Sequence, residues 1–143
     1  TAIGAVVRGY CKSVPSTMKS HRILAAPLRY GAGLKGKLTD AFCQGLVTVT
    51  TEIGAEGLGG VDSFPGVVVP STEFAAETFA KAVVAAYSEQ QPWERMQGSA
   101  YAFAQANLSA KHLRSLLQGF LEARWQTLQQ DRSRDFVGQM LWL

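Results

Sequence analysis

A glycine turn and two lysines lie close together in residues 27–40, a segment whose chemistry suits a bound anion. Gly31 and Gly33 form a G-A-G turn between an apolar run and a helical pattern, and Lys35 and Lys37 follow at once. Glycine lets the backbone approach a phosphate closely, and the free N–H groups at a helix start point toward it. The lysines would add positive charge at the same end. The segment therefore predicts a site for a diphosphate.

An aspartate follows on the same predicted helix, which spans residues 34–44. Gly33, Lys37 and Asp40 are four and three residues apart, so they share one side of that helix. The neighbouring stripe is apolar and would face a sheet: Leu34, Leu38, Ala41 and Phe42. One helix could then hold a diphosphate at its start and place a carboxylate beside a ribose.

Apolar and β-branched runs predict the strands that must position this helix. They lie at residues 5–8, 22–26, 46–51 and 67–69. Ser13 is the predicted cap of a short helix that starts near Pro15. Three further helices close the chain, capped by Thr72, opened by Pro92 and capped by Ser109. The glycine-dense stretch 54–60 predicts a loop, and Trp93, Trp125 and the phenylalanines are expected in the core.

This order predicts an α/β fold, a partial Rossmann-like three-layer domain with a short, mainly parallel sheet and a helical C-terminal tail. We expect residues 1–143 to form a single domain, an incomplete one. Four strands are fewer than the usual mean of about 5–6, which suggests that one edge of the sheet is missing. An exposed strand edge and an uncovered apolar patch favour self-association, so we expect a homodimer.

The charge is uneven along the chain. Residues 1–40 carry seven basic residues and one acid, whereas residues 41–143 carry seven basic and ten acidic residues. A basic first third indicates an anionic partner, although a solvated basic surface explains it equally well. The lysines and arginines are spaced singly and are not interleaved with aromatic residues, which argues against nucleic acid. A small phosphorylated ligand fits better.

Other function classes find no support in the composition. No apolar run approaches the ~18–20 residues of a membrane span. Cys11 and Cys43 do not form a disulfide framework, and two free thiols fit a reducing, cytoplasmic compartment. His21 and His112 lack the spacing of a zinc site and form no hydrolase triad, and we expect no metal. A dinucleotide oxidoreductase is a weaker match, because the glycine pattern and the following acid of that fingerprint are incomplete.

The run APLRYGAGLKGKLTDAFCQGLVTVTTEIGAEGL resembles the donor-binding segment of GT-B-fold glycosyltransferases of the family-four-like group. The match is dense over residues 26–58, and looser similarity extends back to residues 6–10 and on to about residue 125. The resemblance implies a transferase that uses a nucleotide diphosphate sugar as its substrate and needs no cofactor. It also implies that the chain is the C-terminal donor-binding portion, and that the N-terminal acceptor-binding half is missing.

The resemblance further implies the donor-binding residues. The turn at Gly31 and Gly33 would meet the diphosphate, and Asp40 would take the place of the glutamate that binds the ribose. Thr51, Glu52, Ile53 and Gly54 would line the loop after the next strand, and Arg29 belongs to the same matching run. No catalytic residue is identified. We expect that residues 1–143 alone transfer no sugar.

A second hypothesis stays open. Ala32, Asp40 and Val47 depart from the family pattern, where relatives place two glutamates and a proline. The chain could then be a non-catalytic α/β interaction domain that descends from such an enzyme and no longer binds a donor.

Overall fold

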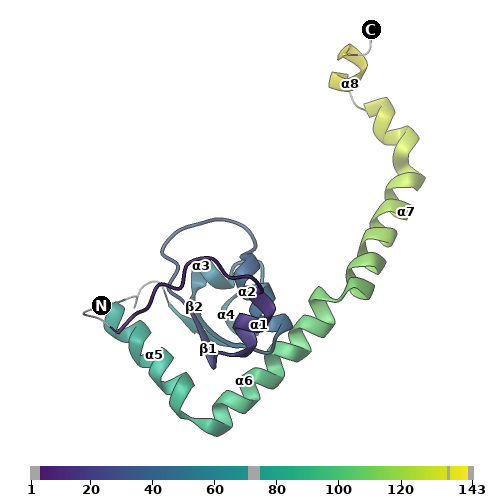
Figure 1. Cartoon of the computed structure of the whole chain (residues 1–143). Helices are drawn as coiled ribbons and strands as arrows, with labels where there is room; N and C mark the ends of the chain where they lie inside the picture. The colour runs from purple at the N-terminus through teal and green to yellow at the C-terminus, as the bar shows by residue number, and fades with distance from the viewer. Residues whose placement is uncertain (1–3, 71–74, 135, 142–143) are drawn as a thin grey trace. The chain divides into compact units, whose positions relative to one another are not determined.

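The computed structural model describes residues 4–70, 75–134 and 136–141 (Figure 1). The chain divides into two compact units, Thr1–Ala106 and Asn107–Leu143. The first unit holds the sheet, and the second holds a long helix. The helices and strands follow in the order α1 (Val14–Lys19), β1 (Ile23–Ala26), α2 (Gly36–Cys43), β2 (Val47–Thr51), α3 (Glu52–Ala55), α4 (Gly60–Ser63), β3 (Val67–Val69), α5 (Ala76–Ser88), α6 (Gln90–Phe103), a π-helical segment η2 (Ala104–Leu108), α7 (Ala110–Arg134) and α8 (Phe136–Leu141).

The three strands form one parallel sheet in the order β1-β2-β3. Ile23 pairs with Val47 in the first ladder, and Val49 pairs with Val67 in the second. Because all strands run the same way, their carboxyl ends meet at one edge of the sheet. This architecture confirms the predicted fold class, a partial Rossmann-like α/β unit with a short parallel sheet and a helical C-terminal tail.

The prediction of a fourth strand at residues 5–8 is wrong. These residues have no regular structure, and Val6 and Val7 are 66% and 94% exposed. A β-branched run forms a strand where it packs on a half-buried surface beside a neighbour. Here the two valines bury little of their surface, so the local preference has nothing to support it.

The central strand β2 is buried over its whole length, since it has a neighbour on each side and helices on both faces. Helix α5 covers one face, where Phe79 and Ala86 pack against Val49 and Val69. Side chains alternate along a strand, so Thr50 points to the opposite face. There it meets α3, whose Gly54 lies directly over it. The sheet is therefore enclosed between two helical layers.

A cluster of three phenylalanines lies under α2. The Phe42 ring is fully buried and makes edge-to-face contacts with Phe64, at 5.3 Å between ring centroids, and with Phe103 of α6, at 5.5 Å. Such edge-to-face pairs stabilise beyond the burial of their area. Phe42 thus fastens α2 to two other parts of the chain.

The helix starts follow the predicted caps where they are described. Ser13 caps α1 by accepting a bond from the Ser16 N–H, and Ser109 accepts one from the His112 N–H at the start of α7. Helix α6 begins at Gln90, two residues before Pro92. Thr72 lies outside the described residues. The predicted loop at 54–60 is partly wrong, because α3 and α4 take up both of its ends.

The expectation that Trp125 and the phenylalanines all lie in the core is wrong for α7. Trp125 is 74% exposed and Phe120 is 59% exposed, and no described residue of α7 is buried. Helical periodicity predicts an apolar face but does not say what covers it.

Among the described residues, no helix is both long and apolar enough to cross a membrane.

Arg22 joins the start of β1 to the corner between α5 and α6. Its Nε donates to the Tyr87 carbonyl at 2.9 Å, and a terminal nitrogen donates to Gln90 Oε1 at 2.8 Å. The guanidinium lies 4.4 Å from the ring centre of Trp93, whose indole N–H returns a bond to the Arg22 carbonyl at 3.0 Å. Hydrogen bonds and a cation–π contact therefore converge on this one side chain.

Candidate functional site

The loop between β1 and α2 carries the glycine turn that the sequence predicts. Gly31 has φ 126° and Gly33 has φ 71°, both in the left-handed region that side chains with a Cβ rarely adopt. The loop leaves β1 at the carboxyl edge of the sheet. Open α/β sheets bind ligands at this edge. The turn thus lies at the edge where such sheets bind ligands, and its backbone conformation favours glycine.

Two buried threonines tie this loop to the end of β2. Thr50 Oγ1 donates to the Ala26 carbonyl at 2.9 Å, and Thr51 Oγ1 donates to the Leu28 carbonyl at 2.6 Å. The Thr51 hydroxyl is used in this way, so it does not cap α3, whose start it precedes. These bonds explain why β2 carries threonines at fully buried positions, and they fix the loop after β1 to the carboxyl end of β2.

Helix α2 starts beside the turn with no capping side chain. Lys35 occupies the cap position, its side chain accepts no bond from the N–H groups of the first turn, and that turn contains no acid. Unpaired N–H groups at a helix start carry partial positive charge and favour an anion. Lys37 and Asp40 are both exposed on α2.

The apolar side of α2 is as the sequence predicts. Leu38, Ala41 and Phe42 are fully buried. Leu34, expected in the same stripe, lies before the helix and is 57% exposed.

Lys35 is not the free cation that its position in the sequence suggests. Its ammonium donates to the Gly33 carbonyl and lies 3.6 Å from Glu56 Oε2. The Lys35 side chain is 11% exposed, whereas that of Glu56 is 57% exposed. Lys35 therefore folds back across the glycine turn and joins it to the loop between α3 and α4, which carries Glu56. Sequence reasoning missed this role of Glu56, because the pair is twenty-one residues apart and no local pattern signals it.

Arg29 lies on the loop after β1 and is exposed. The expectation that Thr51 to Gly54 line a loop is wrong, because Thr51 ends β2 and Glu52, Ile53 and Gly54 lie in α3. Glu52 is exposed, Ile53 is half-buried and Gly54 is buried. An added Cβ at Gly57 would lie 3.4 Å from Leu34 Cδ1, so the two loops approach each other closely. Within the described ranges, no three His, Cys, Asp or Glu side chains gather where a metal ion could be held. The loops offer backbone groups and a few charged side chains instead.

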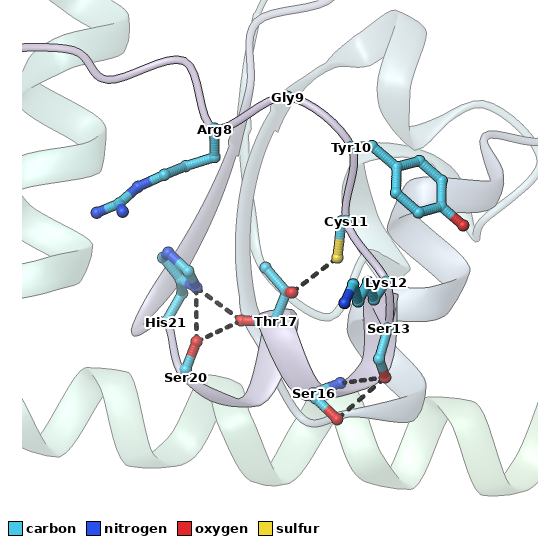
Figure 2. A pocket seen from close by; sticks show the side chains of 10 residues that line it. All are labelled: Arg8, Gly9, Tyr10, Cys11, Lys12, Ser13, Ser16, Thr17, Ser20 and His21. Carbon is cyan, nitrogen blue, oxygen red and sulfur yellow. Dashed lines mark hydrogen bonds between the residues drawn. The ribbon is translucent and has the colours of Figure 1, made fainter.

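A separate surface hollow of about 510 Å³ lies beside α1, lined by residues between Arg8 and His21 (Figure 2). Cys11 Sγ lies 2.8 Å from Thr17 Oγ1, and His21 Nδ1 lies 2.6 Å from the Thr17 carbonyl. The carbonyl can only accept, so Nδ1 carries the proton of this bond. Figure 2 shows the Arg8 guanidinium extending away from Lys12, so the two cations do not converge on one point.

The comparison with protein families finds a match. The family model of glycosyl transferases group 1 matches residues 2–89, which is more than half of the chain. The matched range includes both loops at the carboxyl edge of the sheet and ends just after α5. No curated protein and no solved structure matches the chain. The chain belongs to the family of group 1 glycosyl transferases.

Proposed function

We propose that this chain is the donor-binding portion of a glycosyltransferase and that the turn at Gly31 and Gly33 receives the diphosphate of a nucleotide sugar. The observation that carries the proposal is the uncapped start of α2 beside a left-handed glycine turn, at the carboxyl edge of the sheet. An uncapped helix start offers N–H donors and positive charge to a phosphate. Membership in a glycosyltransferase family supports a nucleotide sugar as the ligand.

In this proposal each candidate residue has a stated role. The N–H groups of the first turn of α2 bind the diphosphate, and Lys37 neutralises part of its charge. Asp40 lies three residues further along α2, where its carboxylate accepts bonds from the ribose hydroxyls. Arg29 and the segment from Thr51 to Gly54, where β2 passes into α3, flank the donor. A separate acceptor-binding half completes the cleft, so we expect no sugar transfer from residues 1–143 alone.

Lys35 has to change partners when a donor binds. Its ammonium is held by the Gly33 carbonyl and by Glu56, across the turn that the diphosphate would occupy. A diphosphate carries more negative charge than one carboxylate and would draw the ammonium away from Glu56. Glu56 thus competes with the donor for the same cation.

Calorimetric titration with UDP and GDP tests the proposal. We expect measurable binding by the wild-type chain and binding about fivefold weaker for Lys37→Ala, because an exposed charge contact contributes up to about 1 kcal/mol. The matched control is Lys81→Ala on α5, which removes the same charge from another exposed helix position and should leave the affinity unchanged. Equal affinities for the wild type and a Lys35→Ala/Lys37→Ala double variant would show that the turn is not the diphosphate site.

Replacing Glu56 with glutamine is expected to raise the affinity for UDP or GDP by about two- to fivefold. The substitution removes the carboxylate charge that holds Lys35, and exposed ion pairs contribute about 0.2–1 kcal/mol. The same titration measures it, and the effect should shrink as salt screens the pair. A loss of affinity in Glu56→Gln would instead mean that Glu56 contacts the donor directly.

A specific observation also favours the second hypothesis, a non-catalytic α/β interaction domain. The Lys35 side chain lies across the turn, where its ammonium bonds the Gly33 carbonyl and pairs with Glu56. If neither the wild type nor Glu56→Gln binds UDP or GDP, this second function is the better description.

A further inference from the structure

One face of α7 presents a long apolar stripe to solvent. Its exposed large side chains are each more than half accessible, from 51% for Leu113 to 74% for Trp125, and they are Leu113, Leu116, Leu117, Phe120, Leu121 and Trp125. Leu128 continues the stripe and is half-buried. From Leu113 to Leu128 the stripe extends about 22 Å along the helix axis. An apolar surface of this extent marks an interaction site.

We propose that α7 pairs with α7 of a second copy of this chain, antiparallel, about a two-fold axis between Phe120 and Leu121. A two-fold interface uses the same patch on both copies, so the patch must be complementary to itself. The stripe meets this condition under reversal about that point. Leu113 falls opposite Leu128 of the second copy.

Phe120 falls opposite Leu121 under the same reversal, so two large apolar side chains meet near the centre of the interface. Leu116 and Trp125 lie on the two edges of the stripe and flank this centre. Leu117 falls opposite Arg124. The Arg124 guanidinium lies 5.8 Å from the centre of the Phe120 ring and 3.2 Å from Asp131 of its own helix. Its aliphatic stem can therefore lie along the interface while the charge stays paired.

The charges on α7 favour the antiparallel arrangement over the parallel one. In a parallel pair, Arg124 would face Arg124 inside the apolar stripe. Like charges held opposite each other destabilise a helix pair. In the antiparallel pair, Arg124 falls opposite Leu117 instead. The same reversal that matches the apolar side chains thus removes this repulsion.

The size of the stripe is adequate for an interface of modest stability. Taking roughly 100 Å² for each large apolar side chain, two stripes bury on the order of 1,200 Å², the lower end of the standard size for specific interfaces. We therefore expect a dimer that dissociates on dilution through the micromolar range.

Sedimentation equilibrium of the full chain tests the pairing. The wild type is expected to be dimeric at high micromolar concentration, and Phe120→Glu is expected to weaken the dimer at least 100-fold, since two added carboxylates would face each other in the apolar stripe. The matched control is Gln126→Glu, which adds the same charge on the opposite side of α7 and should leave the dimer intact. Circular dichroism of both variants checks that α7 remains helical.

Cross-linking tests the direction of the pair. In a chain with Cys11 and Cys43 replaced by serine, a tagged Leu113→Cys protein is mixed with an untagged Leu128→Cys protein under mild oxidation. The expected product is the mixed disulfide of the two proteins. Self-linked Leu113→Cys would indicate parallel helices and overturn the proposal, as would a monomeric wild type, or a dimer that survives Phe120→Glu. None of these readouts involves nucleotide, so they are independent of donor binding.

Discussion

Replacing Phe42 with alanine is expected to lower the free energy of unfolding by about 3–5 kcal/mol, the usual range for removal of a buried phenylalanine. The ring is fully buried and contacts Phe64 and Phe103 edge to face. Its loss would leave a cavity beneath α2 and remove both aromatic contacts. Urea denaturation followed by circular dichroism measures the change.

Two further variants make the Phe42 measurement decisive. Tyr10→Ala removes an aromatic ring that is 91% exposed and should change the free energy of unfolding by less than about 0.5 kcal/mol. Phe42→Leu keeps most of the volume and should cost about 1.5 kcal/mol or less, so it stays measurable if the alanine variant does not fold. An alanine variant as stable as the wild type would contradict the packing described for α2.

Replacing Gly54 with alanine is the second large effect, with an expected loss of about 2–3 kcal/mol. A Cβ at this position would lie 1.9 Å from Thr50 Oγ1, far inside contact distance. Either α3 must shift or the Thr50 hydroxyl must release the Ala26 carbonyl, which it holds at 2.9 Å. The first outcome disturbs the packing of α3 on the sheet, and the second loosens the loop that carries the glycine turn. Thermal or urea unfolding measures the loss.

The controls for Gly54 use the same substitution with the opposite expectation. Gly98 is exposed within α6, and an added Cβ there meets nothing within 4 Å, so Gly98→Ala should stabilise the protein by about 0.5–1 kcal/mol. In a double-mutant cycle, Thr50→Ala should relieve the clash and make the Gly54→Ala change at least about 1 kcal/mol less costly. If the free-energy changes of Gly54→Ala and Thr50→Ala simply add in the double variant, the expected clash between residue 54 and Thr50 does not occur.

The strands and α2 could be predicted because their signals are local. The run from Val47 to Thr51 is β-branched, and the alternation of short strands with helices predicts a parallel sheet. The same reasoning failed at Val6 and Val7, where a strand preference finds no surface to pack on. It failed again at Gly54, whose small size serves close packing over Thr50 within a helix and not the freedom of a loop.

The candidate site was predictable in part. The glycine turn follows from residue type, because left-handed backbone favours glycine wherever it occurs. The inward position of Lys35 could not be predicted, since it depends on Glu56 from another loop. The exposure of the apolar stripe on α7 could not be predicted for a related reason. Periodicity identifies an apolar face, and only the arrangement of the rest of the chain determines whether that face is covered.

The Arg22 corner also bears on where this chain can be cut. The family match ends at residue 89, yet Gln90 and Trp93, two of the groups that hold Arg22, come after that boundary. Phe103, whose ring contacts that of Phe42, also lies after residue 89. A truncated protein that stops at the family boundary would lose these partners and leave the first strand poorly anchored. The smallest piece that folds on its own must therefore include α6. During synthesis, Arg22 is added about seventy residues before Trp93, the last of its partners along the chain.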